Sequence, residues 1–261
     1  MLVRMPDCTC HFVGRLGNHM FILAAAYAHA KRHGYRLVIN AAEGNTKYWN
    51  GTLAGFQRFH GTSTERWLHW REPRWSYTPI PAHVTSLYGF FQSSKYFSEY
   101  SDEIRALFAP PQSIREEVHA KWGSLNKNAV VVHIRRGDYA DPAQAHHGIL
   151  NHIYFLRAMG LAPNSTFAIF SDEIAWCKQQ EWLKRPDCIF VDEPDEANAL
   201  YLMSLFSSFI LSNSSFSWWA AYLASERNVT VWAPDQWFHH TYRIKDYHDV
   251  YEPSWIRVPI V

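Results

Sequence analysis

The sequence predicts an α/β fold with mostly parallel sheets and helices on both faces. Its length, 261 residues, suits one large or two small α/β domains. The first forty residues read as strand, turn, helix and strand, the opening of a Rossmann-like unit. The second half alternates short apolar strands with helices more regularly. A polar link at 123–128 separates the halves, so we expect domains at 1–125 and 126–261.

The N-terminal segment predicts a strand over 9–13, a helix over 20–31 and a strand over 36–40. Gly14-Arg15-Leu16-Gly17-Asn18 is expected to form a glycine-containing turn between the first two elements. This turn lacks the G-x-G-x-x-G spacing of dinucleotide-binding proteins, so it can serve a ligand or only a tight connection.

Residues 45–81 show weak periodicity, which predicts loops and short helices. A strand is expected at 84–91, and helices at 101–108 and 113–122, divided by Pro110 and Pro111.

The second half predicts five strands, the last at 229–232, alternating with four helices. The strands are expected at 130–134, 166–170, 188–191, 209–212 and 229–232. The helices are expected at 151–159, from after residue 173 through 182, at 196–207 and at 216–225.

Composition narrows the class of protein. The formal net charge of +1 argues against a nucleic-acid binder held by bulk electrostatics. No signal peptide or membrane-spanning run is evident, so we expect a cytoplasmic protein, with peripheral membrane association left open. The four cysteines complete no zinc pattern and are expected to be reduced, and no metal site is expected.

The most informative segment is His133-Ile134-Arg135-Arg136-Gly137-Asp138-Tyr139, which follows three valines. A buried strand would deliver these charges to its carboxyl end, where open α/β sheets bind ligands. Arginine forks fit phosphate oxygens, so a nucleotide diphosphate is the first ligand to consider. The alternative is an Arg–Asp salt bridge beside a glycine turn.

Two further segments follow predicted strands. Asn213, Ser214 and Ser215 precede a helix expected from Phe216, and free N–H groups there would form an anion site, or only an ordinary N-cap. Asp172 can accept from the two N–H donors of a guanine edge, or it can cap the helix that follows.

Five segments together resemble glycosyltransferase family 11, the α-1,2-fucosyltransferases. They are 14–21, 89–93, 133–139, 170–173 and 213–219. The resemblance implies a GT-B fold, two Rossmann-like domains facing across a cleft, with GDP-fucose bound mainly by the C-terminal domain. It implies no metal and no cofactor, since GDP-fucose is a substrate. Departures from the family pattern are His19, Phe206, Ser208 and Ala220.

The resemblance also implies roles in an inverting transfer from GDP-β-L-fucose to the 2-hydroxyl of a terminal galactose in a glycan. Arg135 would stabilise the leaving phosphate, helped by Ser214 and Ser215. His133 and Asp172 would hold the guanosine. The remaining expected donor contacts are Asn213, Phe216, Arg15 and Asn18.

A general base is expected to accept the acceptor proton. Asp138 is the first candidate, and His146 and His147 are the second. Alternatively, Asp138 only orients Arg136. His19 and His147 are the expected acceptor contacts.

Three other functions stay open at this point. The chain can be an α-1,6- or protein O-fucosyltransferase of the same superfamily, or a non-catalytic sugar-nucleotide or glycan-binding module. A phosphatase- or kinase-like enzyme is disfavoured, because no nucleophilic cysteine loop and no Walker-type Gly-Lys occur.

Overall fold

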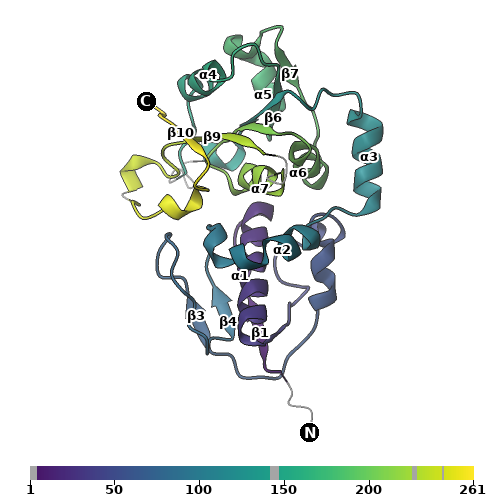
Figure 1. The fold of residues 1–261 in the computed structure, drawn as a ribbon, viewed down its shortest axis with the longest axis vertical. Helices are drawn as coiled ribbons and strands as arrows, with labels where there is room; N and C mark the ends of the chain where they lie inside the picture. The colour runs from purple at the N-terminus through teal and green to yellow at the C-terminus, as the bar shows by residue number, and fades with distance from the viewer. Residues whose placement is uncertain (1–4, 142–146, 225–227, 243) are drawn as a thin grey trace. The chain divides into compact units, whose positions relative to one another are not determined.

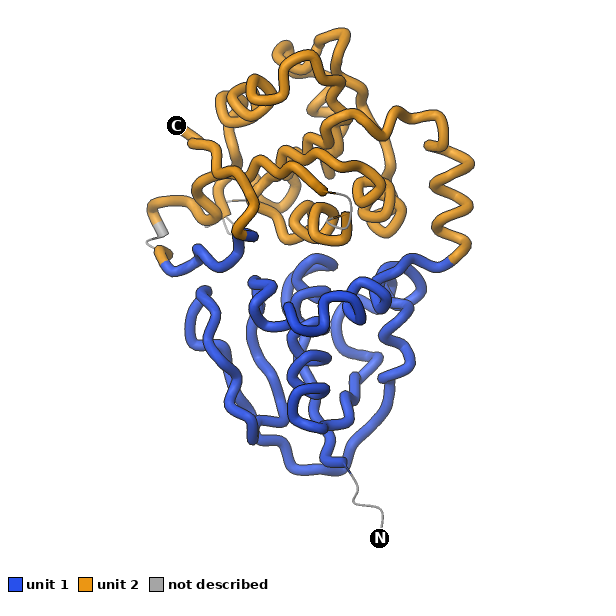
Figure 2. The backbone as a smooth tube through the Cα atoms, viewed as in Figure 1, with its two compact units in different colours: residues 1–111, 246–252 blue, residues 112–245, 253–261 orange. Residues whose placement is uncertain are grey.

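The computed structural model describes residues 5–141, 147–224, 228–242 and 244–261. The chain divides into two compact units, residues 1–111 with 246–252 and residues 112–245 with 253–261 (Figure 2). The sequence placed the division at residue 125, whereas the compact units divide before the helix that ends at Trp122. Segment 246–252 returns to the first unit late in the chain.

The first unit contains a parallel four-stranded sheet in the order β2-β1-β4-β3 (Figure 1). Its strands are β1 (Asp7–Cys10), β2 (Arg36–Leu37), β3 (His69–Arg71) and β4 (Ser86–Tyr88). Its helices are α1 (Leu16–His33) and α2 (Ser101–Leu107), and short 3-10 turns fill much of 46–59 as expected.

Helix α1 begins at Leu16, four residues before the predicted start, with Arg15 as its N-cap. Its run of small and apolar side chains is buried on most of its circumference, which suits a helix enclosed by protein. The helix ends at His33, and its C-cap is Gly34, whose φ of 68° is the left-handed conformation that favours glycine at this position.

The second unit contains a parallel six-stranded sheet in the order β10-β9-β8-β5-β6-β7. Its strands are β5 (Val130–Ile134), β6 (Phe167–Ser171), β7 (Cys188–Phe190), β8 (Ser208–Ile210), β9 (Thr230–Pro234) and β10 (Ile256–Val258). Its helices are α3 (Gln112–Trp122), α4 (His152–Gly160), α5 (Ile174–Gln179), α6 (Glu196–Ser204) and α7 (Ser215–Ala224).

Three element predictions were wrong. The strand at 230–234 is not the last, because β10 follows and pairs with it. Strand β3 lies in a segment that was expected to hold only loops and short helices. The helix expected to continue through Trp182 ends at Gln179 and is followed by a separate 3-10 turn, Glu181–Leu183.

The two faces of the second sheet are separated by the two-residue period of its strands. Val130, Val132 and Ile134 pack in one core cluster with side chains of α4 and α5. His133 lies on the other face, where its ring contacts Phe216 of α7. Figure 1 shows α4 and α5 on one side of this sheet and α6 and α7 on the other.

The described residues contain no helix with the length and apolar character needed to cross a membrane. All four cysteines are free, and burial raises the pKa of the Cys8 thiol to about 12.

Candidate functional site

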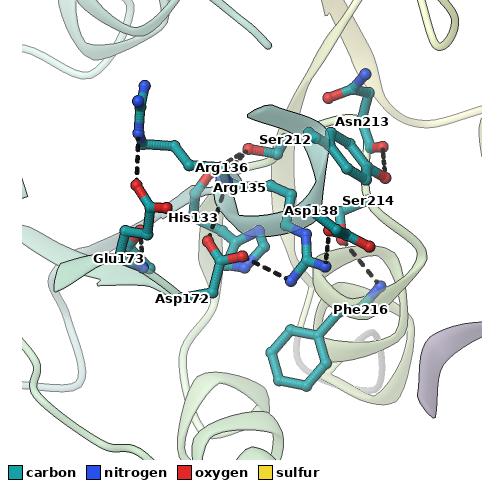
Figure 3. A network of polar contacts seen from close by, with 12 residues as sticks. His133, Arg135, Arg136, Asp138, Asp172, Glu173, Ser212, Asn213, Ser214 and Phe216 are labelled. Carbon is teal, nitrogen blue, oxygen red and sulfur yellow. Dashed lines mark hydrogen bonds and ion pairs between the residues drawn. The ribbon is translucent and has the colours of Figure 1, made fainter. Parts of the chain in front are cut away.

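The carboxyl ends of β5, β6 and β8 bring the predicted polar segments of the second unit together (Figure 3). Strand β5 pairs with β6 on one side and β8 on the other. Residues that follow these three parallel strands therefore gather at one edge of the sheet, which is where ligands of open α/β sheets bind.

His133 is buried at the base of this edge, with 4% of its surface exposed. Its ring centroid lies 5.6 Å from that of Phe216. Burial, and then the positive charge of Arg135, lower the pKa of His133 to about 3, so the ring is neutral at pH 7. Its Nδ1 is buried and has no hydrogen-bond partner among the described residues.

Ser212 joins the end of β8 to the end of β5. Its hydroxyl donates to the carbonyl of His133 at 2.7 Å and accepts from the backbone N–H of Arg135 at 2.9 Å. This bridge fixes the backbone from which the Arg135 side chain departs. Ser212 is the last residue of the strand predicted at 209–212, but its role depends on a neighbour 77 positions away and was not predicted.

The Arg135 guanidinium is held by two carboxylates. Its Nη1 lies 2.8 Å from Asp172 Oδ2, and its Nη2 pairs with Asp138. Its Cζ also lies 5.3 Å from the ring centroid of Tyr139, and 12% of the side chain is exposed. The two carboxylates fix the orientation of this guanidinium and also compensate its positive charge.

Asp172 does more than pair with Arg135. Its Oδ1 accepts from the backbone N–H of Arg136 at 3.0 Å. The N-cap of α5 is Glu173, whose N–H donates to Ser171 Oγ at 3.0 Å. The interpretation of Asp172 as the cap of this helix is therefore wrong.

The Arg136 side chain points away from that of Arg135 (Figure 3) and contacts Trp176 of α5. Its Nε donates to Glu173 Oε2 at 3.0 Å, and its Cζ lies 3.6 Å from the Trp176 ring centroid. The alternative that Asp138 orients Arg136 is wrong, because Glu173 pairs with Arg136 while Asp138 pairs with Arg135. Cation–π contact and ion pairing together give Arg136 a structural role.

Helix α7 starts at Ser215, one residue earlier than predicted. The Ser214 hydroxyl accepts from the Phe216 N–H at 3.3 Å, which confirms a capping serine at the helix start. Ser214 is buried and Ser215 is partly exposed. The first N–H groups of this helix therefore lie at the same sheet edge as Arg135.

The Asn213 side chain connects two other segments of the second unit by hydrogen bonds. Its amide donates to the carbonyls of His147, Gly148 and Trp237 at 2.5, 3.2 and 3.1 Å. Its own carbonyl accepts from the Tyr139 hydroxyl at 3.1 Å. The His147 ring stacks on Tyr139, with 4.3 Å between centroids and 6° between planes. His147 thus packs on the residue that follows Asp138, while His146 is outside the described residues.

The three predicted residues of the first unit surround the start of α1. Arg15 is exposed, and Asn18 Oδ1 accepts from Gln92 Nε2 at 2.8 Å. His19 is 2% exposed and packs against Phe12 and Tyr48. Burial lowers the pKa of His19 to about 4, so this ring is also neutral at pH 7.

At the sheet edge of the second unit, the guanidiniums already pair with carboxylates, so an anion would bind by exchange with a carboxylate. Three carboxylates (Asp138, Asp172 and Glu173) pair with two guanidiniums. A phosphate that binds at Nη1 or Nη2 of Arg135 competes with one of these carboxylates. Within the described ranges, no group of three or more His, Cys, Asp or Glu side chains is placed to hold a metal ion.

Comparison with known proteins matches this sequence to the model of Glycosyl transferase family 11 over residues 50–259. The chain is 36% identical over 163 residues to alpha-1,2-colitosyltransferase of Escherichia coli, covering 58% of this chain and 55% of that protein. It is 28% identical over 282 residues to galactoside alpha-(1,2)-fucosyltransferase 2 of Oryctolagus cuniculus, covering 96% and 76%.

Solved structures support the fold. Fucosyltransferase NodZ from Bradyrhizobium superposes with a TM-score of 0.54 at 14% identity, covering 83% of this chain and 93% of that one. A NodZ alpha-1,6-fucosyltransferase soaked with GDP-fucose gives the same TM-score. The predicted α/β fold of the GT-B class is confirmed. With its family model matched over most of its length, the chain belongs to glycosyl transferase family 11 and is a glycosyltransferase.

Proposed function

We propose that the protein is an inverting fucosyltransferase that moves L-fucose from GDP-β-L-fucose to the 2-hydroxyl of a terminal galactose in a glycan. The observation that carries the proposal is the placement of Arg135 beside the start of α7 at the carboxyl ends of the strands. Relatives named as galactoside alpha-(1,2)-fucosyltransferases support the reaction and the acceptor class. A cytoplasmic location is part of the same proposal.

Negative charge grows on the β-phosphate as its bond to the sugar breaks. Arg135 and the first N–H groups of α7, beside Ser214 and Ser215, would stabilise that charge with fixed donors. These groups are already oriented by Ser212, Asp172 and the helix itself. The proposed step is metal-independent, because the protein supplies the positive charge.

When the donor binds, its phosphate would replace Asp138 as a partner of Arg135. When a phosphate oxygen takes Nη2, the carboxylate of Asp138 is released beside the reacting sugar. Asp138 then accepts the proton of the acceptor hydroxyl as its oxygen bonds to C1, while GDP leaves with the electron pair of the C1–O bond. Asp172 stays, because the Arg136 N–H also holds it.

The remaining contacts belong to the same proposal. His133 and Asp172 would hold the guanosine, where the neutral ring and its unpaired Nδ1 offer an acceptor. Asn213 and Phe216 would line this part of the site. Arg15 and Asn18 would contact the diphosphate or fucose, and His19 and His147 the acceptor.

The test is release of GDP from GDP-fucose with a panel of galactosides, with and without EDTA. The proposal expects turnover on terminal galactosides, unchanged by EDTA, and an α-1,2 linkage by NMR. An α-1,6 linkage, or transfer to a protein serine or threonine, would instead assign one of the alternative fucosyltransferases. Binding of GDP without turnover on any acceptor would support a non-catalytic module.

A second donor is favoured by the relative with 36% identity, an alpha-1,2-colitosyltransferase. Colitose is L-fucose without its 3-hydroxyl, so one pocket can be tuned for either sugar. Competition between GDP-fucose and GDP-colitose at equal concentration gives the ratio of kcat/KM values and decides between them.

A further inference from the structure

The loop Gly89–Ser93 has no part in the mechanism above, although its sequence is one of the segments shared with the family. It follows β4 in the first unit. Strands β1, β3 and β4 are parallel neighbours, so their carboxyl ends share one sheet edge. This edge is where a Rossmann-like unit binds its ligand.

A partly buried carboxylate, Glu72, holds this loop from the end of β3. Its Oε2 accepts from the backbone N–H groups of Phe90 and Phe91 at 2.8 and 2.9 Å. Its Oε1 accepts from the Tyr96 hydroxyl at 2.9 Å. Burial raises the pKa of Glu72, and these three donors offset part of that effect.

The backbone of the loop is adapted to this carboxylate. A Cβ at Gly89 would lie 2.5 Å from Glu72 Cβ, so only glycine fits there. Phe91 has a φ of 51°, a left-handed conformation that is uncommon for a bulky residue. Such backbone strain persists where the surroundings enforce it, and here the hydrogen bonds to Glu72 hold the Phe90 and Phe91 N–H groups.

The two phenylalanines of the loop have opposite environments. Phe91 is fully buried, and its ring lies 5.2 Å from Tyr96 in an edge-on contact. Phe90 is partly exposed and stacks on Trp75, with 4.9 Å between centroids and 18° between planes. Trp75 is also partly exposed. Phe91 thus anchors the loop, and Phe90 forms a partly exposed, stacked aromatic pair with Trp75.

The loop is also tied to the start of α1. Gln92 donates to Asn18 Oδ1 at 2.8 Å, and Gln92 itself is buried. The loop that carries Phe90 is therefore bonded, through Gln92, to Asn18, a residue expected to contact the donor. A carbohydrate acceptor has to reach the sugar of that donor.

We propose that Trp75 and Phe90 form an acceptor subsite that stacks on the apolar face of a pyranoside, with Glu72 as its positioning residue. The proposal rests on the function proposed above and adds the acceptor side. A galactopyranoside exposes adjacent C–H groups on one face because its 4-hydroxyl is axial. The outer ring face of a stacked aromatic pair complements that face of the sugar without using hydrogen bonds.

The test compares KM values for the galactoside and for GDP-fucose. Phe90→Ala and Trp75→Ala should each raise the galactoside KM about tenfold, as expected for one aromatic contact. KM for GDP-fucose and the slow hydrolysis of GDP-fucose without acceptor should stay at wild-type values. Phe90→Tyr, which keeps a flat ring, should restore the galactoside KM.

Trp182→Ala is the matched control. Trp182 is likewise a partly exposed tryptophan stacked on a phenylalanine, Phe155, at 5.8 Å and 17°, but it lies in the second unit. Its substitution should leave the galactoside KM unchanged. An equal rise in all three alanine variants would indicate general destabilisation and overturn the proposal.

Glu72 is tested by a pair of substitutions. Glu72→Ala should raise the galactoside KM as Phe90→Ala does, while Glu72→Gln, which keeps a carbonyl acceptor for the two N–H groups, should largely restore it. A Glu72→Ala enzyme with the wild-type galactoside KM would overturn its positioning role.

Direct binding separates this proposal from the proposed reaction. Ligand-detected NMR of methyl β-galactoside, in the presence of GDP, reports binding whether or not transfer occurs. If wild type binds the galactoside and Trp75→Ala does not, the subsite stands even if fucose is not the sugar transferred. Equal binding by wild type, Trp75→Ala and Phe90→Ala would overturn it.

Discussion

The carboxylate of Asp172 occupies the space in which residue 137 would carry a side chain. A Cβ built on Gly137 would lie 2.3 Å from Asp172 Oδ2, the oxygen that pairs with Arg135. The glycine of the Arg-Arg-Gly-Asp run is therefore required by packing. It lets one carboxylate reach both the Arg135 guanidinium and the Arg136 N–H.

Gly137→Ala should weaken GDP binding about tenfold or more. The added methyl group displaces Asp172, and hydrogen bonds to a charged group contribute about 1.5–3 kcal/mol. Calorimetric titration with GDP measures the change. Gly160→Ala is the control, because a Cβ there meets nothing within 4 Å. Equal GDP affinity in both variants would contradict the packing argument.

Arg135→Ala should lower kcat by about 10²–10³ or more, because the leaving phosphate loses a fixed positive charge. Single-turnover and steady-state rates measure the loss, with circular dichroism to confirm folding. Arg185→Ala, which removes an arginine that also pairs with a carboxylate, Asp187, provides the comparison. Near-normal activity of a folded Arg135→Ala enzyme would refute the assignment.

Asp138→Asn should have opposite effects on binding and turnover. It removes a carboxylate that competes with phosphate for Arg135, so GDP should bind more tightly. It also removes the proposed base, so kcat should fall and the acidic limb of the pH–rate profile should disappear. A profile identical to wild type with only a modest loss of rate would assign the base elsewhere.

The stability of the protein should fall as the pH drops below 6.5. Burial lowers the pKa of His29 to about 4, and its Nε2 donates to the Val84 carbonyl at 2.8 Å. Between pH 6.5 and 4 the unfolded state therefore binds a proton that the native state does not, which costs at most about 1.4 kcal/mol per pH unit for one group.

His29→Gln should reduce this slope. Urea unfolding at pH 7, 6 and 5 gives the free energy of unfolding for both proteins, and the variant should lose less of it on acidification. His83→Gln, which changes an exposed histidine, is the control. Parallel curves for wild type and His29→Gln would show that this ring does not contribute.

The elements that sequence patterns predicted best are those buried on both faces. Val130–Ile134 is buried throughout, and an apolar run of that length is a strong signal for a parallel strand. The missed strands are short and lie at sheet edges. Two of the three residues are exposed in each of these strands, His69–Arg71 and Ile256–Val258, and each strand pairs on one side only. No apolar run therefore marks them in the sequence.

The sequence predicted which segments form the candidate site, but not how most of their side chains pair. Because parallel strands bring their carboxyl ends to one edge, the polar residues after β5, β6 and β8 were expected to meet. Most of the pairing within that edge was not predictable, since it depends on sheet register and rotamers. An Arg–Asp salt bridge was the alternative that the sequence offered for this segment, and Arg135 does pair with Asp138. Ser212 as a bridge and Trp176 beside Arg136 depend on the three-dimensional structure.

Segment 246–252 has a consequence for how the chain is made. Asp249 accepts from the Tyr77 N–H at 2.9 Å and pairs with Lys95, so the first unit uses contacts from a segment more than 130 residues beyond its main body. A nascent chain therefore cannot complete its first unit on the ribosome until the bulk of the second has been synthesised. The two units therefore cannot fold one after the other during synthesis, because the first unit is completed only when segment 246–252 has been made.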